Sequence, residues 1–297
     1  MAEGFAKTRG DKVFIFVNTS ILILITAMVL YPLILVVSSS FSNPLQVMSG
    51  NVWLFPKEFT IQSYQMVFQD SSILIGYRNT LLYTVVGTLI NLTMTIAAAY
   101  PLSRRDFVGR NLITAMFVFT MFFSGGLIPT YLVVKGLGLV DTFWVMVLPN
   151  AVAMYNIIIM RTYMQTSIPP ELHEAAYVDG STNIGVLWRI VLPLSKPILA
   201  VMVLFYGVAH WNAFFNALIY LSDRSHFPLQ LILREILIQN QLSAQIMADV
   251  DSLSDRQMFA EGIKYAVIIV ASVPVLIIYP FLQRYFVKGF MVGALKG

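Results

Sequence analysis

Residues 13–38, VFIFVNTSILILITAMVLYPLILVVS, form a run of 26 residues that contains no charged side chain. A helix rises about 1.5 Å per residue, so about 20 apolar residues cross the roughly 30 Å hydrocarbon core of a bilayer. Lys7, Arg9 and Lys12 precede this stretch, as basic residues precede the core of a signal peptide. A signal core, however, has only about 7 to 15 apolar residues. We therefore predict an uncleaved membrane-spanning helix.

Five further apolar stretches of similar length follow along the chain. The six expected spans cover residues 13–38, 79–103, 111–134, 142–160, 197–221 and 265–283. Of the 297 residues, 58% are hydrophobic and 11% are charged, and the mean hydropathy is +0.75. A membrane barrel alternates lipid-facing and lumen-facing side chains and would be more polar. The composition therefore predicts an all-α polytopic membrane protein that forms a single transmembrane domain over 1–297.

The lysines and arginines are divided unevenly between the two sides of this arrangement. Twelve of the 19 lie in the two terminal tails and in the segments 104–110 and 161–196, and seven lie on the opposite side. Because positive residues are normally retained in the cytoplasm, both termini are expected to be cytoplasmic. Segments 39–78 and 222–264 are then external, and the second is either a solvated loop or a surface that docks an external partner. Its acidic residues include Asp249, Asp251 and Asp255.

Several kinds of chemistry are not expected of this chain. It has no cysteine, hence no disulfide or thiolate site, and its three histidines form no His-x-x-x-His pair that would hold a metal. A Gly-x-x-x-x-Gly-Lys-[Ser/Thr] loop is missing, so ATP and Mg²⁺ would have to bind to partner subunits. The net charge of +4 is spread over a very apolar chain and does not predict nucleic-acid binding. We expect no catalytic residue, no metal site and no cofactor.

The most informative segment between spans is IPPELHEAAYVDGSTNIGVLWRIVLPLSKP, residues 168–197. Its two leading prolines favour a helix start, where the missing N–H matters little, and Gly180 can end that helix. A second helix is expected from Ile184 to Val191, before Pro193 breaks it. We predict a helix-turn-helix on the membrane surface, either an ordinary connector or a lever that inserts into a partner's groove. The predicted apolar stripe of the second helix comprises Ile184, Leu187, Trp188 and Val191.

The order Glu174-Ala175-Ala176, then Gly180, then Ile190-Val191-Leu192-Pro193 resembles the EAA loop of permeases from binding-protein-dependent ABC importers. The resemblance covers nearly the whole chain and is strongest to the carbohydrate class with its MalG-like subunits. Residues 123–139, with 141–144 and 148–149, are similar to permeases for alginate and rhamnogalacturonan oligosaccharides. Trp211-Asn-Ala-Phe-Phe215 resembles a Trp-Asn-x-Phe signature of sugar permeases.

This resemblance implies the permease subunit of a type I ABC importer in the bacterial cytoplasmic (inner) membrane. Its implied partners are a second homologous permease subunit, two ATPase subunits, an external solute-binding protein and an oligosaccharide, with uronate fragments such as alginate favoured. A non-sugar solute is the alternative, since importers of several classes share the EAA loop. In such importers the loop sits in a cleft of the ATPase subunit. The implied coupling residues are Glu174, Ala175, Ala176, Asp179, Gly180, Leu192 and Pro193.

The span 197–221 is unusually rich in polar and aromatic groups, which normally face a bundle interior or a water-filled cavity. Two interpretations stay open. The groups line a translocation path, where aromatic rings and amides suit sugars, or they hold one span to another through hydrogen bonds. The candidates are Tyr206, His210, Trp211, Asn212, Phe215 and Asn216.

Other polar features have simpler expected roles. The side chains most consistent with packing between spans are Asn79, Asn91, Tyr100 and Asn156. Gly125 and Gly126, shortly before Pro129, predict a kink in the span 111–134. The basic turn 103–110 is explained by topology, and no chemistry is assigned to it. The expected spans contain no aspartate and one histidine, which argues against an intramembrane enzyme and against the buried relays of a secondary transporter.

Overall fold

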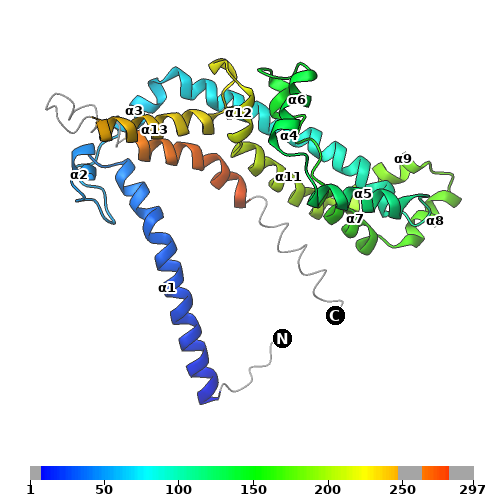
Figure 1. Ribbon diagram of the computed structural model, residues 1–297. Coiled ribbons are helices and arrows are strands. Elements are labelled where there is room, and N and C mark those ends of the chain that lie inside the picture. The colour runs from blue at the N-terminus through cyan, green and yellow to red at the C-terminus, as the bar shows by residue number, and fades with distance from the viewer. Residues whose placement is uncertain (1–7, 247–262, 281–297) are drawn as a thin grey trace. The chain divides into compact units, whose positions relative to one another are not determined.

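The computed structural model describes residues 8–246 and 263–280, and every regular element in these ranges is a helix (Figure 1). The expectation of an all-α chain is therefore confirmed. The acidic residues Asp249, Asp251 and Asp255, the end of the last expected span and the carboxyl tail lie outside the described residues. Contacts divide the chain into a first unit, 1–70 with 236–272, and a second unit, 71–235 with 273–297.

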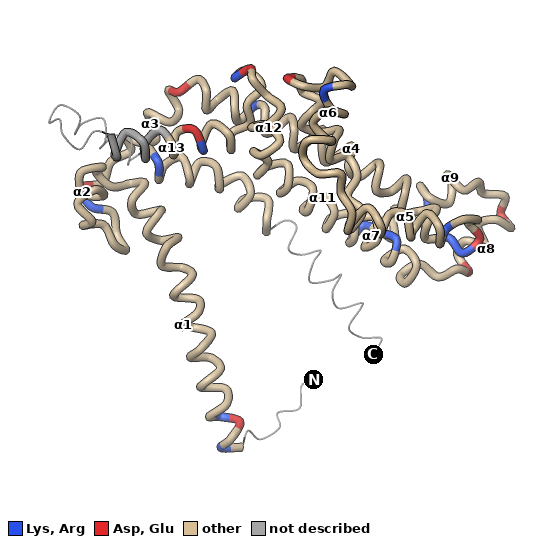
Figure 2. The backbone as a smooth tube through the Cα atoms, in the orientation of Figure 1, with Lys and Arg blue, Asp and Glu red and all other residues tan. Residues whose placement is uncertain are grey.

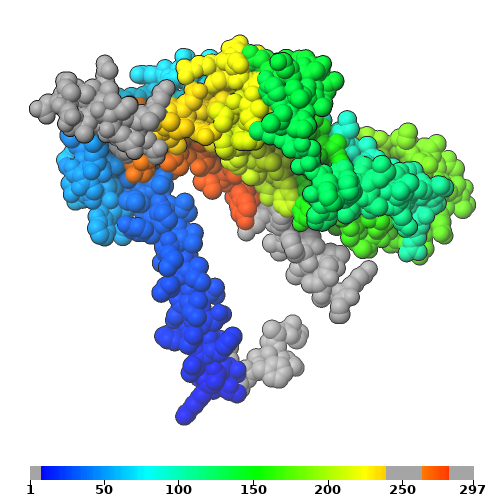
Figure 3. All heavy atoms as spheres, in the orientation of Figure 1, coloured from blue at the N-terminus to red at the C-terminus, as the bar shows by residue number. Residues whose placement is uncertain are grey.

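The first unit begins with α1 (Arg9–Ser40), the helix expected from the opening apolar stretch. Its start is a capping box, in which the Thr8 Oγ1 accepts from the Asp11 N–H at 3.2 Å and the Thr8 N–H donates back to Asp11 at 2.8 Å. None of its most apolar 18 residues is buried within the chain, and Figure 3 shows its side chains as one slender column. A helix that is apolar all round requires lipid or a partner around it.

The segment 39–78 is long enough to have structure of its own, and helices form part of it. It includes α2 (Pro44–Met48), α3 (Gln62–Gln69) and the start of α4. The Ser38 Oγ donates to the Leu54 carbonyl at 2.7 Å, and the Ser40 hydroxyl bonds to that of Tyr64 at 2.8 Å. The serines at the end of α1 thus fold the following segment back onto the helix.

The second unit is built on α4 (Ser71–Ser103), which packs along α7 (Met154–Ser167) and α11 (Lys196–Trp211). α4 starts eight residues before the expected span, because that span was limited to uncharged residues and the helix extends past the charged Arg78. Residues 142–160 do not form one helix: a 3₁₀ turn (Phe143–Met146) and an irregular stretch precede α7. Pro149 lies in that stretch and has no N–H for a helical hydrogen bond.

Two expected spans are interrupted. The span 111–134 consists of α5 (Arg110–Phe122) and α6 (Leu127–Gly136), which meet at 114°. The predicted kink is confirmed, since Gly126 adopts a φ of +83° at the break. The span 197–221 ends its long helix at Trp211 and resumes as α12 (Phe215–Tyr220).

Three of the described helices are long and apolar enough to cross a membrane, and up to five elements qualify if each bent pair is one span. The three are Arg9–Ser40, Ser71–Ser103 and Ile263–Pro280. The bent pairs are α5 with α6, and residues 183–194 with α11 at 81°. Because a span can be a broken helix, apolar length alone overestimates how regular each crossing is.

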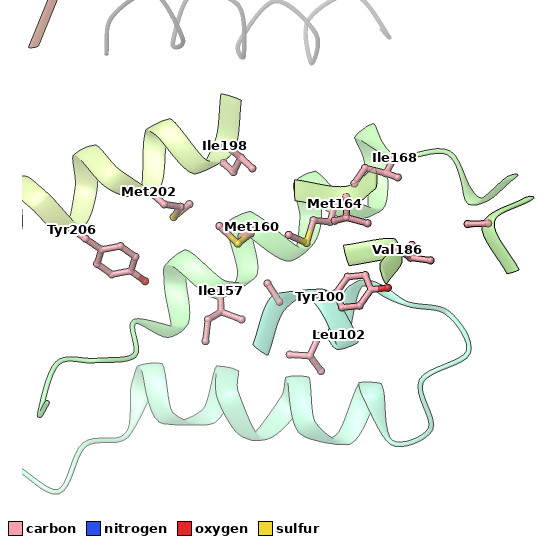
Figure 4. Packing of buried hydrophobic residues seen from close by; sticks show 13 residues of the cluster. Tyr100, Leu102, Ile157, Met160, Met164, Ile168, Val186, Ile198, Met202 and Tyr206 are labelled. Carbon is pink, nitrogen blue, oxygen red and sulfur yellow. The ribbon is translucent and has the colours of Figure 1, made fainter. Parts of the chain in front are cut away.

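The core of the second unit joins α4, α7 and α11 to the short helices that follow α7 (Figure 4). Met160 and Met202 are fully buried between α7 and α11, and Tyr100 and Leu102 come from the last turns of α4. Close packing of this kind resists deformation and transmits displacement. The cluster comprises Ala99, Tyr100, Leu102, Ile157, Met160, Met164, Ile168, Ala176, Val186, Val191, Ile198, Met202 and Tyr206.

Candidate functional site: the EAA hairpin and the polar face of α11

The first helix of the predicted helix-turn-helix is α8 (Pro170–Val178), and Gly180 ends it as expected. The Ser181 N–H bonds to the Ala176 carbonyl at 2.9 Å and the Gly180 N–H to the Tyr177 carbonyl at 3.0 Å, which is a Schellman cap. Gly180 has a φ of +74°, and a Cβ there would meet nothing within 4 Å. Backbone conformation, rather than lack of space, therefore requires glycine.

The second helix differs from the prediction in two respects. It continues as α9 (Asn183–Val186), a π turn (Leu187–Val191) and α10 (Leu192–Leu194), so Pro193 does not break it. The π turn lies directly before Pro193, and the Leu192 N–H reaches back five residues to Leu187. This wider turn changes the hydrogen-bonding register just where a proline would conflict with the α-helical pattern.

The predicted apolar stripe of this second helix is also wrong in part. Val191 is buried, but Ile184 and Trp188 are 69% and 67% exposed, and Val186 is buried in their place. The prediction assumed a period of 3.6 residues throughout. The π turn instead brings residues five apart, such as Val186 and Val191, toward one face.

The segment 170–194, called the EAA hairpin below, has one face packed into the core and one face that is exposed. Ala176 is buried, whereas Glu174, Ala175 and Asp179 are exposed. Gly180 and Pro193 are also exposed and Leu192 is half-buried. The free face carries Val178, 88% exposed, together with Ile184 and Trp188. An exposed patch of large apolar side chains beside charged residues is typical of an interaction surface. Figure 2 shows acidic and basic residues near α8.

On α11, Tyr206 and His210 are buried and bonded to α4. The Tyr206 hydroxyl lies 2.7 Å from the Thr95 hydroxyl, and the His210 Nε2 lies 2.7 Å from the Asn91 Oδ1. Asn91 in turn donates to the Asn150 carbonyl at 2.6 Å. These two α11 residues therefore connect α11 to α4 through hydrogen bonds, and Asn91 has the packing role expected of it.

The remaining four candidates, at the end of α11 and beyond it, have other surroundings. Trp211 is buried, with its ring 6.0 Å from that of Tyr77. Asn212 is exposed and donates to the Val208 carbonyl at 2.9 Å. Phe215 is exposed and Asn216 is half-buried, both beyond the break that ends α11. A role for all six residues in the translocation path stays a prediction.

A cavity of about 300 Å³ lies beside Trp211. Its wall is almost wholly apolar and comes from α4, α11 and the helix Ile263–Pro280. The lining residues are Thr84, Val85, Thr88, Leu89, Leu92, Val203, Leu204, Gly207, Val208, Trp211, Val275 and Ile278. Its chemistry suits hydrocarbon better than sugar hydroxyls.

A sequence profile described as "Binding-protein-dependent transport system inner membrane component" matches residues 71–292. The chain belongs to this family. The permease is 42% identical to the protein LplC of Bacillus subtilis, over 98% of this chain and 97% of that protein. It is 38% identical to the polygalacturonan/rhamnogalacturonan transport system permease protein YtcP of Bacillus subtilis, over 97% of this chain and 99% of that protein.

The fold of the permease is also known from solved structures. A bacterial ABC transporter involved in the import of the acidic polysaccharide alginate contains a chain that superimposes with a TM-score of 0.86 at 32% identity, covering 95% of this chain and 99% of that one. The permease thus has the type I ABC importer fold. It is a multi-pass protein of the inner membrane and a carbohydrate-class ABC permease subunit.

At the Ser71 end of α4 the permease contains a group of contacts that the sequence did not predict. The Asp141 Oδ1 accepts from the N–H groups of Ser222 and Asp223 at 2.9 and 3.0 Å, and these bonds hold the pKa of the Asp141 carboxyl below its usual value. The Asp141 N–H donates to the Tyr220 carbonyl at 2.9 Å, and Asp141 has a φ of +59°. Positive φ is tolerated by aspartate, which is one signal for such a turn.

The loop 222–229 is fastened to α4 as well. The Asn79 Nδ2 donates to the Ser225 and Phe227 carbonyls at 2.7 and 3.0 Å, and the Tyr83 hydroxyl donates to the His226 carbonyl at 2.8 Å. Asn79 was expected to bind between spans but instead binds a loop nearly 150 residues later in the chain. The amide was recognisable from the sequence, whereas its partner was not.

Proposed function

We propose that this permease imports oligosaccharides released from acidic polysaccharides, as one of two homologous permease subunits that work with two ATPase subunits and an external solute-binding protein. The observation that carries the proposal is full-length similarity to permeases of this substrate class. YtcP is named for polygalacturonan and rhamnogalacturonan transport, and the solved importer takes up the acidic polysaccharide alginate. The alginate importer has also been solved with an alginate pentasaccharide-bound periplasmic protein, which supports the same kind of partner here.

The EAA hairpin supplies the mechanism that we propose for coupling. Its exposed face, with Glu174, Val178 and Trp188, would enter a groove of an ATPase subunit. Its buried face, at Ala176 and Val186, belongs to the same packed cluster as α4, α7 and α11. Because a close-packed cluster moves as a unit, displacement of the hairpin would move the ends of three long helices. ATP and Mg²⁺ bind and react in the ATPase subunits under this proposal.

The test is ATP hydrolysis by the complete importer in lipid nanodiscs, with its solute-binding protein presented in different loaded states. We expect strong stimulation with alginate or rhamnogalacturonan oligosaccharides and little with neutral maltooligosaccharides of equal length. Stimulation by the neutral sugars alone would overturn the substrate class. Stimulation by a non-sugar solute and by none of the sugars would overturn the carbohydrate assignment for this subunit.

A further inference from the structure

The turn 104–109 between α4 and α5 starts from a firmly held point. The Arg161 Nε donates to the Leu102 carbonyl at 2.9 Å, and the Gln165 Nε2 lies 3.4 Å from the Ser103 carbonyl. The last carbonyls of a helix have no partner inside the helix, so these two α7 side chains cap α4. The first residue of the turn therefore has a fixed position relative to α4 and α7.

That first residue, Arg104, directs its guanidinium toward the EAA hairpin. It forms a two-pronged ion pair with Asp106, Nε to Oδ1 at 3.0 Å and Nη2 to Oδ2 at 2.9 Å. The side chain of Arg104 is only 13% exposed although that of Asp106 is 69% exposed. Asp106 thus orients the guanidinium without burying it. The guanidinium carbon lies 5.2 Å from the ring centroid of Tyr177 on α8, within the range of a cation–π contact.

Tyr177 and its neighbours connect both helices of the hairpin to the last turns of α4. The Tyr177 hydroxyl bonds to the Asn183 side chain, and the Tyr100 hydroxyl donates to the Asn183 carbonyl at 3.2 Å. The ring of His173 lies 6.5 Å from that of Tyr100. Arg104 stands on the α4 side of this set and brings a positive charge against α8.

The polar atoms of Arg104, His173, Tyr177 and their neighbours are only partly paired by hydrogen bonds. The Arg104 Nη1 and the His173 Nδ1 are buried and find no hydrogen-bond partner among the residues that the structure describes. Burial of unpaired polar groups is unfavourable, so the arrangement depends on ring stacking and on charge.

We propose that Arg104 is a positioning residue for energy coupling: it holds Tyr177, and with it the exposed face of α8, in register with α4. The inference rests on the proposed role of the hairpin as a lever. Arginine suits the position because its planar guanidinium can pair with Asp106 through two hydrogen bonds and lie over the Tyr177 ring at the same time. Lysine can keep the charge but not that double contact.

The experiment compares Arg104→Gln with Arg105→Gln in the complete importer. Arg105 is adjacent and exposed, so its substitution removes the same charge from the same turn. In nanodiscs, hydrogen exchange over residues 170–183 is expected to be about fivefold faster for Arg104→Gln and unchanged for Arg105→Gln. In proteoliposomes, the alginate oligosaccharide imported per ATP hydrolysed should fall about fivefold in Arg104→Gln only. Arg104→Lys should behave like Arg104→Gln although it keeps the positive charge of the turn.

The two measurements separate coupling from folding. Equal exchange in the two glutamine variants would overturn the contact, and faster exchange with an unchanged import-to-ATP ratio would overturn its role in coupling. Tyr177→Leu loses the Asn183 hydrogen bond as well as the Arg104 contact, so in this background Arg104→Gln should accelerate exchange no further, because the contact that it removes is already absent. A wild-type importer that no loaded binding protein stimulates would refute the proposed function, while the exchange comparison would still decide whether Arg104 holds α8.

Discussion

The two ends of α4 are fastened by different kinds of contact. At the Ser71 end, Asn79 and Tyr83 bond to backbone carbonyls of the loop 222–229, at 2.7 to 3.0 Å. At the Ser103 end, the contacts with the EAA hairpin are mostly between side chains, including the Arg104–Tyr177 stack. A buried backbone carbonyl is costly to leave without a hydrogen bond, whereas stacked side chains can rearrange. The comparison indicates that the loop 222–229 is fixed on α4 through its backbone, whereas the EAA hairpin is positioned on α4 mainly through side chains such as Arg104 and Tyr177.

The largest effect is expected from Asn79→Ala. It leaves the carbonyls of Ser225 and Phe227 without their donor, and each unpaired buried group is unfavourable by about 1 to 3 kcal/mol. We expect a loss of about 3 kcal/mol in unfolding free energy, measured by thermal unfolding in nanodiscs. Thr93→Val is the control, because the exposed Thr93 hydroxyl bonds only to the Leu89 carbonyl of its own helix. Similar losses in both variants would show that the Asn79 bonds to the Ser225 and Phe227 carbonyls do not fix the loop to α4.

Charge reversal on the free face of the hairpin comes next. Glu174→Lys should lower binding-protein-stimulated ATPase activity and import about tenfold, because it reverses the charge on the face that is proposed to enter the ATPase groove. Thermal unfolding should be unaffected, since Glu174 is exposed. Unchanged stimulation in Glu174→Lys would remove the hairpin from the coupling mechanism.

A smaller effect is expected at the turn of the hairpin. Gly180→Ala forces a side chain into a φ of +74° without any steric contact, which costs about 1 kcal/mol. The penalty should appear as faster hydrogen exchange over residues 176–183 and leave the Ser71 end of α4 unchanged. Gly180→Asn should be milder, because asparagine tolerates this conformation. Equal effects of alanine and asparagine would contradict the conformational explanation.

The smallest effect concerns pH. Burial, and then the nearby Arg104, lower the pKa of His173 below its usual value of 6.5, so the folded hairpin favours the neutral ring. Stability from this source is present above pH 6.5 and decreases as the pH falls toward the lower folded pKa, by less than about 1 kcal/mol for a partly exposed group.

Hydrogen exchange of α8 should therefore accelerate between pH 7 and 5.5 in the wild type, after correction for intrinsic exchange, and less so in His173→Gln. Asp106 faces the same set, but the Arg104 hydrogen bond holds its pKa below the usual value, so it stays ionised in this window. An equal pH response in both proteins would assign it to another group.

Much of the permease was predictable because its signals are local. The uncharged run within α1, the proline start of α8, the Gly180 cap and the kink at Gly126 each depend on the preferences of a few neighbouring residues. The EAA pattern is local too, which is why the sequence alone was enough to infer the family. Apolar length was less reliable, since residues 142–160 are apolar enough for a span but contain a 3₁₀ turn and Pro149.

Hydrophobicity and backbone preference act over one or two turns of chain, so the residues alone are enough to predict the solvent, the helical class, the family and the turn that shapes the hairpin. The partners of the polar residues, in contrast, depend on the tertiary structure. Asn79 meets Ser225 across 146 residues, Tyr206 meets Thr95 across 111, and Arg104 meets Tyr177 through a turn that the sequence marked only as a topological signal. Such pairings follow from how three helices pack, and no short segment contains that information.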